Sequence, residues 1–383
     1  MVRLNIIIIC LLCFVAGLTE LVISGILPYI AEEFDVSIGT AGQAVTIFAF
    51  VFALSGPLII AFTTHINRKK LFVGFIVLFI LGNLLTLISS GFYLFMASRV
   101  ILAVGVSMII ALSLSLSVKL VPVHRQSRVI SILIMAISAS LVLGIPIGIM
   151  ISEYLGWKAI FIFVTIVCTI ILGLIIKYFP SNITIEKVTL LEQSKALLDS
   201  RITFAHLTTF FFFTGQSIFY IYFTPFITEV LHYSASTASM LYLAYGVSAV
   251  FGGAMSGILV ERIGTKSTLV IVILFYTLTM LSISVTSNWF VIMFINTGIW
   301  GMLGWAINTP QQTYLINLSQ KYASFNQTFS TSTIQFGIAM GSLLGALLLG
   351  AIESYYVLIW IGSSVVGVGF ICLLISIKQS QKI

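Results

Sequence analysis

The chain has 383 residues, of which 60% are hydrophobic and only 8% are charged. Soluble proteins carry about 25% charged residues, so this composition excludes an ordinary soluble domain. The formal net charge of +7 follows the polar breaks between apolar runs and does not indicate a nucleic-acid partner.

Apolar runs of about 20 residues, each long enough to cross a bilayer core of about 30 Å, recur from one end of the chain to the other. The expected class is therefore an all-α integral membrane protein in contact with the lipid bilayer. Twelve transmembrane helices are expected near residues 4–30, 41–63, 71–90, 93–118, 128–151, 159–179, 203–228, 236–260, 267–286, 289–314, 327–350 and 354–377.

The longest polar stretch, near residues 180–202, divides these spans into two sets of six. We therefore expect an N-terminal six-helix bundle (1–180), a cytoplasmic linker (181–202) and a C-terminal six-helix bundle (203–383).

The basic residues indicate how the helices are oriented. If the N-terminus is cytoplasmic, every Lys and Arg falls on the cytoplasmic side except Lys158, which falls outside, and Arg99, which falls within a span. Because the cytoplasmic loops of membrane proteins are rich in Lys and Arg, both termini are expected in the cytoplasm.

The two halves repeat each other at a constant offset. The stretch "LPYIAEEFDVSIGTA" (27–41) resembles "TPFITEVLHYSASTA" (224–238), and Pro28 and Pro225 are 197 positions apart. The same offset relates Ser37 to Ser234, Thr40 to Thr237, Gly56 to Gly253, Gly144 to Gly341 and Gly148 to Gly345. Because each half has an even number of spans, both enter the membrane in the same orientation, and the chain is expected to form two parallel-repeat six-helix bundles. In such folds the substrate site lies near the membrane midplane, between the halves.

Glu20 is the acidic residue expected deep within a span, and Arg99 is its basic counterpart. At 1.5 Å per residue their depths differ by only about 6 Å, so the two side chains can meet if their spans face each other. Burial favours a protonated acid and a nearby guanidinium favours the carboxylate, so a movement between these environments would bind and release a proton. The pattern predicts a proton-coupling pair, and the alternative is a static ion pair that clamps two helices.

Amide and aromatic side chains in the second half are candidates for substrate binding. A four-residue spacing would put several of them on one helix face. Amides form paired hydrogen bonds and aromatic rings stack on flat heterocycles, which suits a purine. Each of these residues has an alternative role in an interfacial belt or in helix packing. The candidates are Asn296, Trp300, Asn308, Gln311, Gln216, Tyr220, Tyr245 and Gln335. The histidines have no carboxylate or cysteine cluster beside them, so no metal site is expected.

Several stretches resemble the major facilitator superfamily, in its twelve-helix drug:proton antiporter branch. "GILVERIGTK" (257–266) is similar to the family's gating loop G-x-L-x-D-R-x-G-x-K, with Glu261 in place of the aspartate. "LGIPIG" (143–148) resembles the antiporter motif of the fifth span, whose glycines and proline allow close packing and bending. The resemblance implies gating-loop roles for Gly257, Glu261, Arg262, Gly264, Lys266, Arg68 and Lys69, and helix-bend roles for Gly144, Pro146 and Gly148.

Within this branch, "GLTELVISGILP" (17–28) and "WGMLGWAINTPQQTYLI" (300–316) resemble bacterial purine base and nucleoside efflux pumps, and more loosely sugar-efflux relatives. The resemblance implies a proton antiporter of the bacterial plasma membrane that exports small neutral solutes, foremost purine bases or nucleosides, by alternating access. It would act as a monomer, without enzymatic activity, and with the proton gradient in place of a cofactor. The alternatives are multidrug or sugar efflux on the same fold, and a transporter-like membrane sensor.

Overall fold

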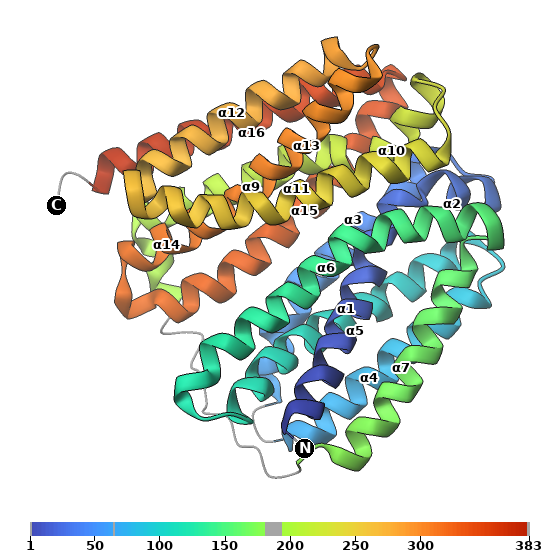
Figure 1. Ribbon diagram of the computed structural model, residues 1–383, viewed down its shortest axis with the longest axis vertical. Helices are drawn as coiled ribbons and strands as arrows, with labels where there is room; N and C mark the ends of the chain where they lie inside the picture. The colour runs from blue at the N-terminus through green and yellow to red at the C-terminus, as the bar shows by residue number, and fades with distance from the viewer. Residues whose placement is uncertain (1, 64–65, 181–193, 381–383) are drawn as a thin grey trace. The chain divides into compact units, whose positions relative to one another are not determined.

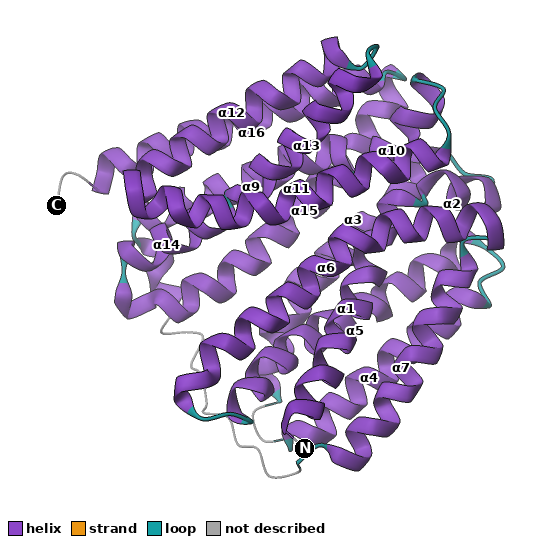
Figure 2. Cartoon of the chain, in the orientation of Figure 1, coloured by secondary structure: helices purple, strands orange, loops and turns teal. Residues whose placement is uncertain are grey.

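A computed structural model of the chain describes residues 2–63, 66–180 and 194–380. Within these ranges the secondary structure is helical and contains no strand (Figure 2). The chain divides into two compact units, Met1–Val36 with Ile47–Val188 and Ser37–Thr46 with Thr189–Ile383, so the division falls within one helix, α3 (Figure 1). Most of the expected linker, 181–202, lies outside the described residues.

The helices that precede the linker are α1 (Val2–Gly25), α2 (Leu27–Glu33), α3 (Ile38–Phe62), α4 (Arg68–Leu87), α5 (Phe92–Lys119), α6 (Val123–Leu155) and α7 (Lys158–Tyr178). The helices that follow it are α9 (Ser200–Tyr220), α10 (Phe223–Pro225), α11 (Ala235–Ile263), α12 (Thr265–Thr286), α13 (Phe290–Ala306), α14 (Asn308–Leu318), α15 (Ala323–Ile352) and α16 (Tyr355–Ser380). Three short elements complete the set: η1 (Ser194–Leu198), η2 (Phe226–Val230) and η3 (Gln320–Tyr322).

The twelve expected spans are confirmed. The described residues contain twelve helical segments that are long and apolar enough to cross a membrane, from Arg3–Gly25 to Tyr355–Ser380. Their bounds agree with the expected ones to within a few residues at most ends. The class is an all-helical membrane protein of two repeated halves.

The repeat is also visible in how helices begin. At the start of α3, the Ser37 hydroxyl accepts a hydrogen bond from the Thr40 backbone N–H at 3.1 Å. At the start of α11, the Ser234 hydroxyl accepts the equivalent bond from Thr237 at 3.2 Å. A serine in this position satisfies a backbone donor that the first helical turn leaves open, so both halves use the same cap 197 positions apart.

Left-handed backbone positions repeat as well. Asp35 has φ 51° and His232, at the same offset, has φ 55°. Gly156 has φ 80° and ψ 150° where α6 ends, and its equivalent Glu353 has φ 52° and ψ 26° where α15 ends. Both halves therefore use a positive φ at this point, but only Glu353 adopts the left-handed helical conformation.

Prolines explain where the structure departs from the expected continuous spans. The first span was expected to run to residue 30, but α1 ends at Gly25 and α2 begins at Leu27, one residue before Pro28. The seventh span is interrupted after Tyr220, ahead of Pro225, and the tenth is interrupted at Ile307, ahead of Pro310. Proline has no N–H to bond the carbonyl four residues back, so a helix that approaches it breaks or restarts.

Glycines allow two helices of the first unit to approach closely. α6 runs without interruption through Pro146 and packs along α1. A Cβ added at Gly144 would lie 2.9 Å from Leu18 Cδ1, and one added at Gly148 would collide with Val22 Cγ2. The packing that the antiporter-like motif implied therefore occurs against α1, the helix that carries Glu20.

Candidate functional site

A fully buried arginine lies at the centre of the first unit. Arg99 of α5 has no exposed surface, and its two terminal nitrogens donate to the Thr19 carbonyl of α1 at 3.3 and 3.4 Å. Its guanidinium carbon lies 4.4 Å from the centre of the Phe48 ring in α3. The Arg99 Nε–H has no hydrogen-bond partner among the described residues. Three helices therefore hold the cation, and one of its donors remains open.

Glu20 lies next to Thr19 in α1, and its charge acts on the Arg99 guanidinium, so the two ionisable groups are near each other. Glu20 is partly exposed, whereas Arg99 is completely buried. The role of this pair in proton coupling stays a prediction.

A second cluster lies within the second unit and is aromatic. The Trp300 ring of α13 lies 5.0 Å from the Tyr245 ring, 5.9 Å from the Tyr220 ring, 5.4 Å from the Phe223 ring and 5.5 Å from the Phe219 ring. We call Tyr220, Tyr245, Trp300 and Gln216 the aromatic–amide cluster. The Trp300 indole N–H donates to the Tyr276 hydroxyl at 2.8 Å, which fixes the ring plane.

Two polar atoms of the aromatic–amide cluster have no protein partner. Gln216 donates from Nε2 to the Tyr245 hydroxyl at 2.9 Å, but Gln216 Oε1 and the Tyr220 hydroxyl are buried without a hydrogen bond among the described residues. An unsatisfied buried polar atom costs about 1–3 kcal/mol, so such atoms call for an explanation. A bound ligand with a donor for Gln216 and a partner for Tyr220 supplies one.

The other candidate residues in the second half form hydrogen bonds outside the aromatic–amide cluster. Asn296 of α13 donates from Nδ2 to the hydroxyls of Ser282 and Thr286 in α12, at 2.8 and 2.9 Å. Asn308 donates to the Trp305 carbonyl at 3.2 Å, where α13 ends. Asn296, Trp300 and Asn308 therefore have different hydrogen-bond partners, although Ile307 between α13 and α14 keeps helical dihedral angles.

Two buried glutamines complete the predicted set. Gln311 of α14 donates to the Ala205 carbonyl at 2.7 Å and to the Thr209 hydroxyl at 2.9 Å, which ties α14 to α9. Gln335 is buried within α15. Both amides lie in the same unit as the aromatic–amide cluster.

The gating-loop residues are placed at helix ends. Lys69 donates from Nζ to the carbonyls of Ile176 and Phe179 at 3.0 and 2.5 Å, at the end of α7. Its repeat equivalent Lys266 donates to the Ser380 hydroxyl of α16 at 2.7 Å. In each half a lysine thus links the third span to the sixth.

The remaining gating-loop residues differ in exposure. Arg68 is buried, while Glu261 and Arg262 are exposed. Gly264 has φ 83° between α11 and α12, and Gly257 has open space around its α-carbon.

Some residues of both clusters were not identified from the sequence. Phe48 and the Thr19 carbonyl hold Arg99, and Tyr276 holds Trp300. Each contact joins two different spans, and an aromatic residue in an apolar run carries no signal that distinguishes such a partner from ordinary packing.

The described residues form twelve spanning segments in two repeated halves. One half contains a buried charge and the other contains the aromatic–amide cluster. This is the architecture of a polytopic membrane protein of the secondary-transporter class. The family model described as Major Facilitator Superfamily matches residues 9–202 and 205–382. The chain therefore belongs to the major facilitator superfamily, and it is a multi-pass membrane transporter and not an enzyme.

Relatives of similar length support this placement. The chain is 27% identical to YbcL, an uncharacterised transporter of this type from Bacillus subtilis (strain 168), over 98% of this chain and 96% of that protein. It is 22% identical to a probable sugar efflux transporter of Helicobacter acinonychis (strain Sheeba), over 90% of this chain and 88% of that protein.

A solved structure supports the fold. The crystal structure of a D-xylose–proton symporter superposes with a TM-score of 0.80, at 15% identity, over 98% of this chain and 97% of that chain. At this identity the likeness concerns the fold alone.

Proposed function

We propose that the chain is a proton-coupled antiporter that exports small neutral solutes, foremost purine bases or nucleosides, by alternating access. The observation that carries the coupling is the pairing of a partly exposed Glu20 with a fully buried Arg99. The cation is held by Thr19 and Phe48 and cannot reach water, so Glu20 is the group that exchanges a proton. Protonation of Glu20 removes its attraction for Arg99 and changes the balance between the two access states.

The aromatic–amide cluster supports the substrate class. The Tyr245 and Tyr220 rings lie 5.0 and 5.9 Å from Trp300 in edge-to-face contacts within the buried cluster, and Gln216 Oε1 offers an acceptor to an N–H edge. A flat heterocycle with donors and acceptors on its rim matches this combination, and stacking of a base on an aromatic ring contributes about 1–3 kcal/mol. Gln311 Oε1, which is also buried without a partner among the described residues, adds a further acceptor in the same unit.

A sugar is the second candidate substrate. The relative from Helicobacter acinonychis is named as a probable sugar efflux transporter, and tryptophan faces with amide groups also suit a pyranose ring. Multidrug export of organic cations has less support, because Glu20 is the acid that the sequence places within the membrane.

The proposed stoichiometry has an energetic consequence. If one proton enters for each neutral solute expelled, one positive charge moves inward per cycle, and the membrane potential contributes about 2.3 kcal/mol per 100 mV. That corresponds to a concentration ratio of roughly fortyfold before any pH gradient is added. We place both termini in the cytoplasm of a bacterial cell, from the distribution of Lys and Arg, and propose that a monomer performs the cycle.

The direct test is proton flux in liposomes that contain the purified protein and a pH-sensitive dye. Adenine, hypoxanthine, inosine, arabinose and ethidium are added in turn. A flux on adding a purine supports the lead proposal. A flux with arabinose or ethidium alone retains the antiporter and replaces the substrate, and no flux with any of the five contradicts both.

A further inference from the structure

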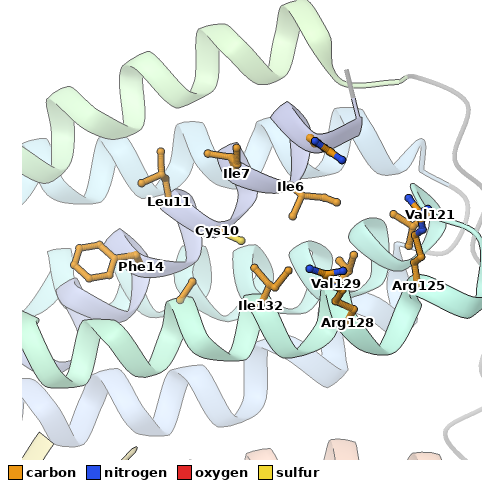
Figure 3. Close-up of a pocket in the computed structure, with 12 residues that line it drawn as sticks. Ile6, Ile7, Cys10, Leu11, Phe14, Val121, Arg125, Arg128, Val129 and Ile132 are labelled. Carbon is orange, nitrogen blue, oxygen red and sulfur yellow. The ribbon is translucent and has the colours of Figure 1, made fainter. Parts of the chain in front are cut away.

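A cavity of about 880 Å³ lies within the first unit, apart from the Arg99 site and the aromatic–amide cluster. It opens between the first turns of α1 and the first turns of α6 (Figure 3). Its lining residues are Arg3, Ile6, Ile7, Cys10, Leu11, Phe14, Val121, Arg125, Arg128, Val129, Ile132 and Ala136. We call this space the arginine cavity.

The arginine cavity is cationic at one end and apolar along its walls. Arg3 comes from α1, and Arg125 and Arg128 come from α6. All three are exposed, and within the described part of the chain none forms an ion pair. The lining contains no carboxylate. Three guanidinium groups that form no ion pair among the described residues favour an anionic ligand at this end of the cavity.

The apolar walls exclude a small hydrated anion as the natural occupant. Below the arginines the α1 wall consists of aliphatic residues, Cys10 and Phe14, and the α6 wall is also apolar. Ile7 and Leu11 remain 57% and 50% exposed. In Figure 3 the Cys10 sulfur and the Ile132 side chain point toward one another across this space. Free phosphate gains nothing by contact with an apolar surface, whereas a hydrocarbon chain that covers this surface removes it from water, which is favourable.

The length of the cavity matches one leaflet of a bilayer. From Arg3 to Phe14 the α1 wall rises over 11 residues, which is roughly 16 Å of helix. From Arg125 to Ala136 the α6 wall rises by the same amount. Half of a bilayer core is roughly 15 Å thick. A ligand with an anionic head at the arginines and a chain that ends near Phe14 therefore fills the cavity from the membrane surface to the midplane.

The helix packing explains why the space exists at this end. Toward the middle of the membrane, α6 lies tightly on α1 through Gly144 and Gly148. In the first turns Arg3 of α1 and Arg128 of α6 line the cavity, and both side chains are exposed. The helices are thus held together in one leaflet and leave a space in the other.

We propose that the arginine cavity is a binding site for an anionic phospholipid, such as phosphatidylglycerol, from the leaflet that faces the N-terminus. The phosphate lies among Arg3, Arg125 and Arg128, and one acyl chain lies along Ile7, Leu11 and Phe14. Basic pockets between membrane helices bind lipid head groups in this manner. The inference requires that α1 and α6 cross the membrane, and it does not depend on which substrate is transported.

The test is a lipid titration of the detergent-purified full chain, followed by native mass spectrometry. Phosphatidylglycerol, phosphatidylcholine with the same acyl chains and water-soluble glycerol phosphate are compared. The expected result is one tightly bound phosphatidylglycerol. Arg125→Gln with Arg128→Gln should weaken its binding by about 25-fold, at about fivefold for each arginine near the surface. Lys177→Gln, an exposed lysine outside the cavity, is the matched control and should leave binding unchanged.

Three results would overturn the proposal. Equal binding of phosphatidylcholine would remove the role of charge. Equal affinity for glycerol phosphate would make the site one for a soluble anion. Equal weakening by Lys177→Gln would show a diffuse surface effect.

A thiol measurement keeps the proposal testable if the double variant fails to fold. Cys10 lines the cavity, and the other three cysteines are buried. In a chain with Cys13, Cys168 and Cys372 replaced by alanine, phosphatidylglycerol should slow the reaction of Cys10 with N-ethylmaleimide at least fivefold relative to phosphatidylcholine. An equal rate in both lipids would contradict occupation of the cavity.

Discussion

The guanidinium carbon of Arg99 lies 4.4 Å from the centre of the Phe48 ring. The cation is thus in contact with an aromatic face on one side and with the Thr19 carbonyl on another. In an apolar interior a cation needs such partners, because burial of an unpaired charge is costly. The arrangement holds Arg99 in place, and the partly exposed Glu20 is the group to which the proposed function assigns proton exchange.

Glu20→Gln should abolish proton-coupled transport while the protein remains folded. Glutamine keeps the shape of the side chain and cannot exchange a proton, so substrate-induced proton flux in liposomes should fall to the level of empty vesicles. Glu33→Gln is the control, because Glu33 forms an exposed ion pair with Lys158 at 2.8 Å and should transport normally. Export against a gradient by Glu20→Gln would disprove the coupling role.

Phe48→Leu should remove the cation–π contact that stabilises the buried Arg99 guanidinium. The substitution keeps an apolar side chain and removes the ring face, whose contact with a desolvated cation contributes about 2 kcal/mol. We expect a lower melting temperature in a thermal-shift measurement. Phe161→Leu in α7 is a control for loss of a fully buried ring, whose aromatic contact is with Trp157. Equal destabilisation by the two changes would show that Phe48 acts by packing alone.

Tyr220→Phe distinguishes a ligand-binding cluster from a packing cluster. The Tyr220 hydroxyl has no partner among the described residues, so its removal should leave the melting temperature unchanged or raise it slightly. If the hydroxyl bonds substrate, affinity measured by isothermal titration should fall roughly fivefold to tenfold. Tyr276→Phe is the contrasting variant, since it removes the acceptor of the Trp300 indole and should lower stability. Unchanged substrate affinity in Tyr220→Phe would place the ligand elsewhere.

Gly148→Ala should destabilise the first unit. The added methyl group would collide with Val22, and overpacking of this kind costs about 1–3 kcal/mol. Gly173→Ala in α7 is the matched control, because nothing lies within 4 Å of a Cβ there, and it should be neutral or stabilising. Thermal unfolding in the same detergent compares the two, and equal melting temperatures would contradict the close approach of α6 and α1.

The Asp199–Arg201 pair predicts a dependence of stability on pH. The Arg201 side chain donates to the Asp199 carboxylate at 2.7 Å and holds the pKa of that carboxyl below its usual range. A carboxyl whose pKa is lower when folded contributes stability above its unfolded pKa, about 3.9, and loses it as pH falls through the folded pKa.

The matched variant for this pair is Asp199→Asn, which keeps an acceptor for the first turn of α9. Its melting temperature should lie below that of the unmodified protein by a constant amount from pH 5 to pH 8. The difference should correspond to less than about 1 kcal/mol, because the pair is partly exposed. It should shrink below about pH 4, and a difference that persists undiminished at lower pH would rule out the ionised pair as its source.

The fold could be predicted from the sequence because its determinants are local or periodic. Apolar runs gave the twelve spans, and a constant offset gave the repeat that the caps at Ser37 and Ser234 confirm. Depth along the spans predicted that Arg99 lies level with Glu20, and Arg99 contacts α1 at Thr19, while the coupling role of the pair stays a prediction. The partners Phe48 and Tyr276 could not be predicted, since their roles depend on how two helices face each other.

The tenth span shows the limit of periodicity. Asn296, Trp300 and Asn308 keep the spacing of one helix face, and Ile307 between α13 and α14 has helical φ and ψ of −70° and −30°. Their hydrogen-bond partners nevertheless differ, because a spacing rule gives the helix face on which a side chain lies and not the partner that it meets.

The unequal helix ends at Gly156 and Glu353 have a consequence for substitution. Gly156 has φ 80° and ψ 150°, a conformation that is essentially restricted to glycine, whereas Glu353 has φ 52° and ψ 26°, which other residues adopt at a cost of about 1–2 kcal/mol. Glycine therefore fits at position 353 and glutamate does not fit at position 156, so the two equivalent positions can exchange residues in one direction only.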